Sequence, residues 1–302
     1  MTVDIRPGTR DDFRPALEIL FHAYNDLLMR QGLAETAEVN DAELEEFWPG
    51  FNGLSEHLFD TGDQFWIAEN DGRPIGYVRS ILRDGVRILT EFFVLPGEQE
   101  GGLGRRLIER AVPSDDDRRG LLILSTGDVR AMGRYLKLGL WGQGVVCRFD
   151  CPQPRHEVLP DDSQPVRAEP GAELVQELAA LDRAVLGFSR DLDHHWWLRT
   201  RDCWVLRRDG AVSAYAYLMP AYTGPFAAPR ADDMIGLLIH AENLACEGGW
   251  DHGLRICLSN RPAANHLLGR GYGMDGFWLH VLADIELPGL DTYVLCSPAI
   301  IP

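Results

Sequence analysis

The sequence is short of positive charge, and of lysine above all. Lys137 is its only lysine, and 29 Lys and Arg together stand against 46 Asp and Glu, for a formal net charge of −17. A surface that binds nucleic acid or an anionic membrane needs clustered basic residues. This balance therefore predicts neither nucleic acid nor a membrane as partner.

Paired cysteines and long apolar runs are also missing. The six Cys are scattered without a Cys-x-x-Cys motif, which disfavours a disulfide framework, so we expect buried, reduced thiols and no metal. No run of about 18 apolar residues occurs, and the first residues lack the basic and then apolar parts of a signal peptide. These absences predict a soluble, cytoplasmic protein.

The chain does have the material for packed cores and a duplicated plan. Its 302 residues are 45% hydrophobic, which suggests two ordinary domains. Three features recur in the same order in both halves. They are Ile5-Arg6 and Val166-Arg167, Trp66–Gly72 and Trp204–Gly210, and Asp128-x-x-Ala131 and Asn260-x-x-Ala263.

A proline-rich segment separates the two halves. Residues 151–165 carry four prolines and two adjacent acids, a composition that suits neither a helix nor a central strand. We therefore expect one domain over residues 1–150, a linker over 151–164 and a second domain over 165–302.

Each half alternates strand and helix patterns. In the first half, strands are expected near 3–6, 65–69, 75–82, 87–95, 121–125 and 145–149, and Asp71-Gly72 is a hairpin-turn dipeptide. A helix over about 41–59 is expected to break at Pro49-Gly50. The order predicts an α+β (α/β layered) fold, in which each domain has a mixed central sheet flanked by helices.

The richest local pattern follows the strand that ends at Pro96. A glycine-rich turn, Gly97 to Gly104, leads at once into an amphipathic helix. The first N–H groups of a helix are unpaired and its dipole favours an anion there, while glycines let phosphate oxygens approach the main chain. The turn suits a pyrophosphate, although the same pattern also fits an ordinary Gly-rich start of a helix.

Two common phosphate motifs do not fit this turn. The Walker Gly-x4-Gly-Lys-Ser/Thr pattern needs a lysine that is absent, and Gly-x-Gly-x-x-Gly does not occur here. Gln99-x-x-Gly102-x-Gly104 instead resembles the Gln/Arg-x-x-Gly-x-Gly/Ala signature of the GNAT superfamily of N-acetyltransferases. The later run Asp128-x-x-Ala131 with Tyr135 and Gly139 resembles that family's Asn-x-x-Ala-x-x-x-Tyr-x-x-x-Gly-Phe motif.

The resemblance covers about residues 3–149, with a weaker echo over 165–283, and it implies a tandem acetyltransferase that uses acetyl-CoA as cosubstrate and needs no metal. In the family, main-chain N–H groups of this turn hold the donor's pyrophosphate, and the preceding strand pairs with its pantetheine arm. The donor-binding residues so implied are Phe92, Phe93, Val94, Gln99, Glu100, Gly101, Gly102, Leu103, Gly104 and Arg105.

The same resemblance implies catalytic roles for two residues. Tyr135 would protonate the departing thiolate, a role that a phenol with a pKa near 10 can fill; otherwise its ring packs beneath the turn. Glu91 would be the general base, unless the strand turns it to solvent or to a structural Arg, in which case a water chain is needed. Three acids depart from the family pattern: Asp128 in place of Asn, and Glu98 and Glu100 where basic residues are more usual.

The second copy lacks the chemistry of the first. Leu267 stands at the position of Tyr135, and residues 224–233 contain no Gly-x-Gly and end in two acids. We therefore expect a degenerate copy without donor binding, which supports the first copy and helps to wall its acceptor cleft.

The acceptor is the part that the sequence leaves open. Six acids over 35–46 lead into Phe47-Trp48 and either attract a cationic amine or form a solvated helix face. Polyamine-like or aminoglycoside-like amines, an amino acid and a peptide N-terminus all remain candidates. The leading expectation is acetyl transfer to an amine by direct attack in a ternary complex. The alternatives are a non-catalytic acyl-CoA sensor and a mycothiol-synthase-like acetyltransferase, and the oligomeric state is not predicted.

Overall fold

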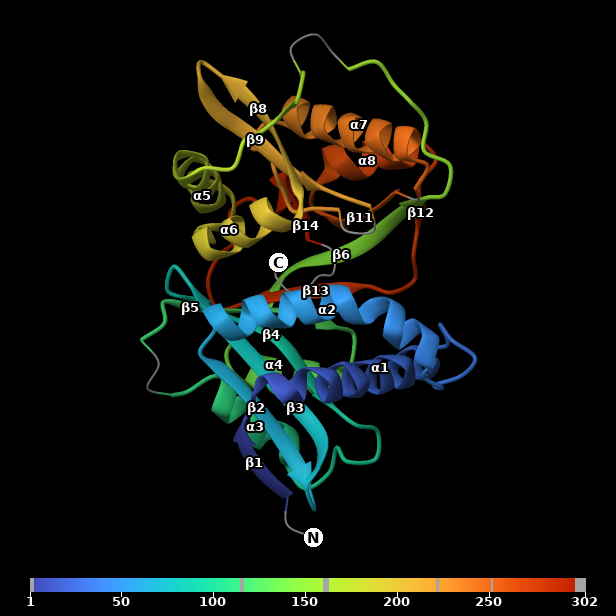
Figure 1. Cartoon of the computed structure of the whole chain (residues 1–302), viewed down its shortest axis with the longest axis vertical. Coiled ribbons are helices and arrows are strands. Elements are labelled where there is room, and N and C mark those ends of the chain that lie inside the picture. The colour runs from blue at the N-terminus through green and yellow to red at the C-terminus, as the bar shows by residue number, and fades with distance from the viewer. Residues whose placement is uncertain (1–2, 115–116, 160–162, 221–222, 251, 297–302) are drawn as a thin grey trace. The chain divides into compact units, whose positions relative to one another are not determined.

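A computed structural model describes residues 3–114, 117–159, 163–220, 223–250 and 252–296. By internal contacts the chain forms two compact units, one of residues 1–123 with 128–134 and one of residues 124–127 with 135–302 (Figure 1). Residues 160–162 of the expected linker lie outside the described part. No helix among the described residues is long and apolar enough to cross a membrane.

The first unit is a sheet with helices. β1 to β4 pair antiparallel in chain order, and β4 pairs parallel with β5. The elements are β1 (Val3–Pro7), the 3₁₀ turn η1 (Arg10–Asp12), α1 (Phe13–Arg30), α2 (Asp41–Thr61), β2 (Gln64–Asn70), β3 (Arg73–Arg83), β4 (Val86–Val94) and α3 (Leu103–Ala111), followed by β5 (Gly120–Thr126) and α4 (Val129–Lys137), which both cross the division between the units.

The strands of the second unit pair antiparallel in the order β7-β8-β9-β10-β14-β11-β6-β13, and the short β12 also pairs with β6. Its elements are β6 (Trp141–Cys151), β7 (Val166–Arg167), α5 (Ala172–Leu186), α6 (Asp191–Thr200), β8 (Asp202–Arg208), β9 (Ala211–Leu218), β10 (Phe226–Ala227), α7 (Ala231–Gly248), β11 (His252–Cys257), α8 (Arg261–Gly269), β12 (Gly273–Met274), β13 (Leu279–Ala283), η2 (Leu290–Thr292) and β14 (Tyr293–Leu295).

The predicted fold class is confirmed, since helices flank sheet strands that pair both parallel and antiparallel. The contact units do not follow the boundary drawn from the sequence, because β6 pairs with β11 and β13 and so belongs to the second unit. The predicted domains, residues 1–150 and 165–302, therefore remain a proposal that rests on the sequence repeat.

Fine details of the backbone repeat between the halves. Asp71 and Gly72 have φ of 50° and 78°, and Asp209 and Gly210 have φ of 51° and 84°, as a two-residue hairpin turn with two positive φ angles requires. Each hairpin also has a bulge at the same place, where Ile75 of β3 and Ser213 of β9 have no partner in the opposite strand. The fold does not require the same turn and the same bulge in both hairpins, so their recurrence supports the duplication.

Two local expectations were wrong. α2 continues through Pro49, although proline removes a helical N–H. Leu44, Leu54 and Leu58 on either side of it are buried, and this shared apolar face holds the helix together. Among the cysteines, which were expected to be buried, Cys246 is exposed while the other five are buried, and all six are free.

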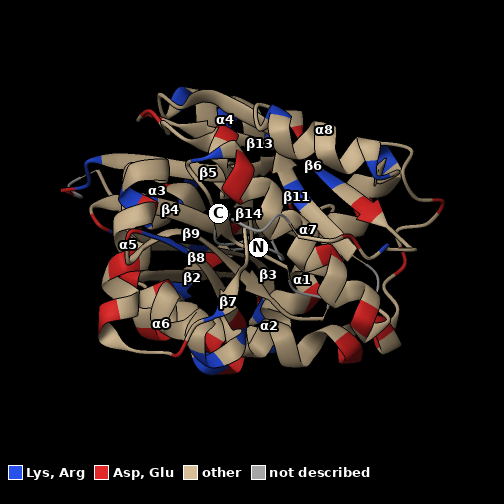
Figure 2. Cartoon of the chain, turned by 90° about the horizontal axis from the view of Figure 1, so that it is seen from above, with Lys and Arg blue, Asp and Glu red and all other residues tan. Residues whose placement is uncertain are grey.

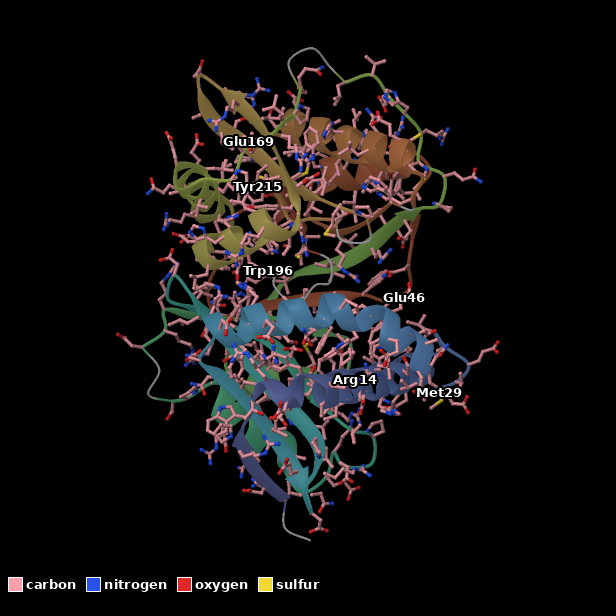
Figure 3. The ribbon with its side chains drawn as sticks, in the orientation of Figure 1. Arg14, Met29, Glu46, Glu169, Trp196 and Tyr215 are labelled. Atoms are coloured by element: carbon pink, nitrogen blue, oxygen red, sulfur yellow. The ribbon has the colours of Figure 1, made fainter. Side chains whose placement is uncertain are left out.

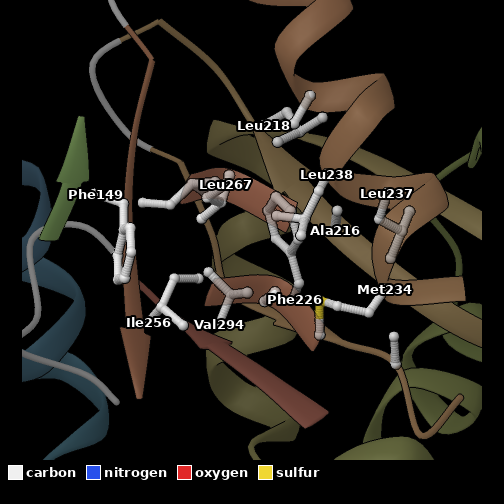
Figure 4. Close-up of a cluster of buried hydrophobic side chains, with 14 of the residues drawn as sticks. Phe149, Ala216, Leu218, Phe226, Met234, Leu237, Leu238, Ile256, Leu267 and Val294 are labelled. Carbon is white, nitrogen blue, oxygen red and sulfur yellow. The ribbon is translucent and has the colours of Figure 1, made fainter. Parts of the chain in front are cut away.

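Leu267, which stands at the position of Tyr135 in the second copy, lies in the core of the second unit. Leu267 is 1% exposed and packs with a cluster that includes Phe149, Phe226 and Ile256 (Figure 4). A separate core in the first unit packs Phe13 and neighbours from α1 and α2 against β2 and β3. Burying such apolar side chains is the main favourable term in folding.

Candidate functional site

The predicted donor strand has an open edge. β4 pairs with β5 only from Val86 to Leu89. At Thr90 the β3–β4 register shifts, so that one residue bulges out of the ladder. Beyond it, Glu91 to Val94 keep β3 on one side and, among the described residues, have no strand on the other. An extended ligand group could pair with this edge.

The turn after β4 presents free N–H groups at the start of α3. Gly101 and Gly102 have φ of 66° and 75°, a left-handed conformation that explains glycine at both positions. In the described part of the chain, the backbone N–H groups of Gly101, Gly102 and Gly104 have no hydrogen-bond partner. Unpaired donors and the positive end of a helix dipole together attract an anion.

Gly104 has closely packed neighbours instead. A Cβ at this position would lie 3.1 Å from the ring of Phe92 and 3.2 Å from the guanidinium of Arg134. Arg134 itself donates to the carbonyl of Arg130 one turn earlier in α4. Its guanidinium therefore lies beside the turn, where positive charge would attract a diphosphate. The sequence reading missed Arg134, although it directly precedes Tyr135 in the motif.

Gln99 ties the turn to the end of β4 and to α4. Its amide Nε2 donates to the carbonyl of Val94 at 3.1 Å, and its Oε1 accepts from Arg130. Asp128, the acid in place of the family's Asn, binds Arg130 at 2.7 Å and Arg30 at 3.2 Å. The Gln99 side chain thus positions the turn relative to the end of β4 and to α4.

The Asp128 carboxylate is held in its charged form. Burial alone would raise its pKa, but hydrogen bonds from the Arg130 side chain and backbone outweigh burial and lower the pKa to about 2. Its Oδ1 accepts from the N–H of Arg130 at 2.9 Å, as a residue at a helix start does. Asp128 thus performs the capping task of an Asn and adds an ion pair.

Glu91 lies inside the sheet. It is 2% exposed, its Oε1 accepts a 3.0 Å hydrogen bond from Tyr77, and its Oε2 lies 3.3 Å from the Nε of Arg79 in a geometry that gives an ion pair without a hydrogen bond. Of the orientations left open by the sequence, the structure shows contact with a structural Arg. Burial raises the pKa of Tyr77 well above its usual value, so this phenol stays protonated.

Tyr135 lies on α4 directly after Arg134 and is 5% exposed. Its carbonyl accepts from the N–H groups of Leu138 and Leu140, which ends the helix.

Two acids lie in the turn before α3: Glu98 has a basic neighbour and Glu100 is exposed. Glu98 lies 4.0 Å from Arg73, and the largely exposed Arg105 lies 3.5 Å from Glu109. Figure 2 marks the acidic and basic residues along the ribbon. The positive groups placed at the turn are thus Arg130 and Arg134 of α4 rather than Arg105.

The predicted acceptor region consists of α1, α2 and their connection. Glu35, Glu38, Asp41, Glu43 and Glu46 are exposed, whereas Glu45 pairs with Arg14 at 2.7 Å. Figure 3 labels Arg14 on α1 and Glu46 on α2. The aromatic end is half buried, with Phe47 packed edge-on against Phe21. Both readings of this region, cation recognition and a solvated face, remain compatible with these positions.

The second unit has a different arrangement at the matching place. β10 spans only Phe226–Ala227, and α7 begins at Ala231 with two acids in its first turn. One of them, Asp233, is fully buried and paired with Arg208. A carboxylate there occupies the positive end of the helix dipole that a phosphate would need.

Known proteins resemble one part of this chain in sequence and nearly all of it in fold. Residues 61–139 match the family model described as the acetyltransferase (GNAT) domain. No match was found among curated proteins. A putative acetyltransferase from Pyrococcus horikoshii has a similar structure, with a TM-score of 0.72, 14% identity, and coverage of 96% of this chain and 92% of the other.

Two further solved structures extend over nearly the whole chain. A GCN5-related N-acetyltransferase from Sphaerobacter thermophilus has a TM-score of 0.60 at 14% identity, covering 96% of this chain and 97% of its own. A tandem GNAT protein from the clavulanic acid biosynthesis pathway has a TM-score of 0.57 at 12% identity, covering 93% and 98%. At these identities the likeness shows the fold. Residues 61–139 thus match a GNAT acetyltransferase domain, and the chain as a whole has the fold of tandem GNAT proteins.

Proposed function

We propose that this protein is an acyl-CoA-dependent N-acetyltransferase that moves an acetyl group from acetyl-CoA to an amine by direct attack in a ternary complex. The observation that carries the proposal is the turn at the start of α3, where Gly101, Gly102 and Gly104 offer unpaired N–H groups beside the Arg134 guanidinium. This set of donors suits the diphosphate of coenzyme A.

The rest of the donor would follow the open edge of β4. The pantetheine arm carries amide groups, which can pair with the main chain of Phe92, Phe93 and Val94 as a short strand would. The bulge at Thr90, where pairing with β5 stops, supports this placement. The thioester would then lie toward the bulge and its acyl carbon toward the acceptor.

In the proposed reaction the neutral amine attacks the thioester carbonyl, a C–N bond forms and the C–S bond breaks. Tyr135 would give its phenolic proton to the departing sulfur, which leaves as the CoA thiol. The proton of the attacking nitrogen would pass to Glu91 or through a water chain to solvent. The burial of Glu91 and its pairing with Arg79 favour the water chain.

We propose that the second copy does not bind a donor. The short β10, the buried Asp233 at the start of α7 and the core position of Leu267 support this assignment. An acceptor site bordered by the acidic residues 35–46 would favour a cationic amine, which would be bound as the ammonium form and lose a proton before attack.

The test is release of CoA thiol from acetyl-CoA by the whole chain, with polyamines, aminoglycosides, amino acids and a peptide as acceptors. The proposal expects release that depends on both substrates, together with an acetylated amine in the mass spectrum. The second candidate, a non-catalytic acyl-CoA sensor, is favoured by the burial of both Tyr135 and Glu91. Saturable CoA binding without turnover of any amine would establish the sensor and reject the enzyme.

A further inference from the structure

The second unit contains a pocket that the proposed chemistry does not use. It has a volume of about 400 Å³, within the usual range for small-ligand sites. The end of α6, the start of β8, the end of β9 and the last part of α7 form its walls. Its lining includes Arg167, Arg199, Arg201, Trp204, Leu244 and Trp250.

The pocket is positive in a strongly negative protein. Three Arg and one Asp line it, an excess of two positive charges in a chain of net charge −17. Arg167 pairs with the lining Asp202. Arg201 is nearly buried and donates to the carbonyl of Gly224.

Arg199 is the cation that remains available. It is exposed and, in the part of the chain that the structure describes, its guanidinium has no hydrogen-bond or ion-pair partner. A planar guanidinium that lines a pocket can bind a carboxylate through two parallel hydrogen bonds.

Two indole side chains, Trp204 and Trp250, also line the pocket. The Trp204 ring packs edge-on against His240, with ring centroids 4.1 Å apart, and this contact fixes the orientation of the indole. Burial lowers the pKa of His240 to about 4, so the imidazole beside Trp204 is neutral. Trp250 and Leu244 add apolar surface. An indole favours a flat aromatic ligand, because two aromatic rings can contact each other in an offset-stacked or edge-to-face arrangement.

We propose that this pocket binds a small planar aromatic carboxylate, whose ring contacts the indoles of Trp204 and Trp250 and whose carboxylate pairs with Arg199. The site is built only from residues of the second unit. Binding at this pocket does not depend on CoA binding or on acetyl transfer. A failure of the proposed function would therefore leave this proposal unchanged, and the reverse also holds.

The test is calorimetry on the whole chain with naphthalene-2-carboxylate as probe. We expect saturable binding that weakens as salt is added, and about tenfold or weaker binding of naphthalene-2-carboxamide, which has the same ring without the charge. Arg199→Glu should weaken binding of the carboxylate about tenfold or more. Arg230→Glu is the matched control, since Arg230 is exposed in the same unit but does not line the pocket.

Circular dichroism and the midpoint of thermal unfolding show whether each variant is folded. A second variant, Trp250→Ala, should lower the affinity of carboxylate and carboxamide alike, because it removes ring contact and leaves the charge. Absence of binding by naphthalene-2-carboxylate overturns the proposal. Equal binding of the carboxamide, or equal loss in Arg199→Glu and Arg230→Glu, would overturn it as well.

Discussion

The hydroxyl of Tyr77 donates a 3.0 Å hydrogen bond to Glu91 inside the first unit. Tyr215, at the same place in the repeated hairpin, donates to Asp182 in the second unit. Both carboxylates are buried and each is paired with a buried Arg, which is Arg79 in the first case. The two tyrosines occupy matching places, but the acid comes from β4 in the first unit and from α5 in the second. A buried tyrosine that binds a carboxylate–arginine pair in both units, including the copy proposed not to bind a donor, indicates a role in folding.

This arrangement predicts a stability cost for Glu91→Gln. The variant leaves the buried Arg79 charge without a counter-charge, and breaking one side of such a pair costs about 3–5 kcal/mol. Urea unfolding measures the change. The double variant Arg79→Met with Glu91→Leu should recover much of the loss, and a cost below about 1 kcal/mol for Glu91→Gln would contradict a role for the ion pair in stability.

Tyr135→Phe separates catalysis from donor binding. It removes only the hydroxyl, so we expect kcat to fall about 10²-fold while the affinity for CoA stays within about twofold. Steady-state kinetics and calorimetry measure the two quantities. Unchanged kcat would remove Tyr135 from the reaction, and a loss of affinity equal to the loss of kcat/KM would assign it to binding.

Asp128→Asn should produce a stability difference that depends on pH. The folded protein holds the pKa of Asp128 near 2, below its ordinary value of 3.8. The ion pair therefore stabilises the protein fully above about pH 4, and this contribution disappears as the pH falls toward 2. Since the carboxylate is partly exposed, we expect the variant to lose roughly 1 kcal/mol at pH 7. Unfolding at pH 7 and pH 3 should show the two proteins converging at the lower value.

Pro49→Ala should stabilise the first unit. Pro49 is exposed in the interior of an unbroken α2, where proline lacks the N–H of the helical hydrogen bond. Alanine restores that bond, and an increase of about 1 kcal/mol or more in the free energy of unfolding is expected. Thermal or urea unfolding measures it, and a lower stability of the variant would show that the proline kink itself is needed by the packing of α2.

Patterns that act locally could be predicted from the sequence. Asp71-Gly72 and Asp209-Gly210 identified both hairpins because these dipeptides adopt the positive φ angles that the turns require. The glycines before α3 identified a helix start with exposed donors for the same reason.

What the sequence reading missed depends on contacts between distant residues. No helix was predicted over 191–200, where α6 places His194 against Asp182 and Tyr217. The position of Arg134 beside Gly104 and the burial of Glu91 against Arg79 likewise arise from packing between separate elements. Spacing along the chain carries little information on such pairs.

Calorimetry with CoA on the whole chain and on Gly104→Val tests the central claim most directly. A side chain at Gly104 would press on Phe92 and Arg134 and displace the turn, whereas Gly53→Val, on the exposed face of α2 with open space around it, is the matched control. We predict saturable CoA binding by the wild type and by Gly53→Val, and binding about tenfold or more weaker for Gly104→Val. No binding by the wild type, or equal binding by all three proteins, would contradict a diphosphate site at this turn.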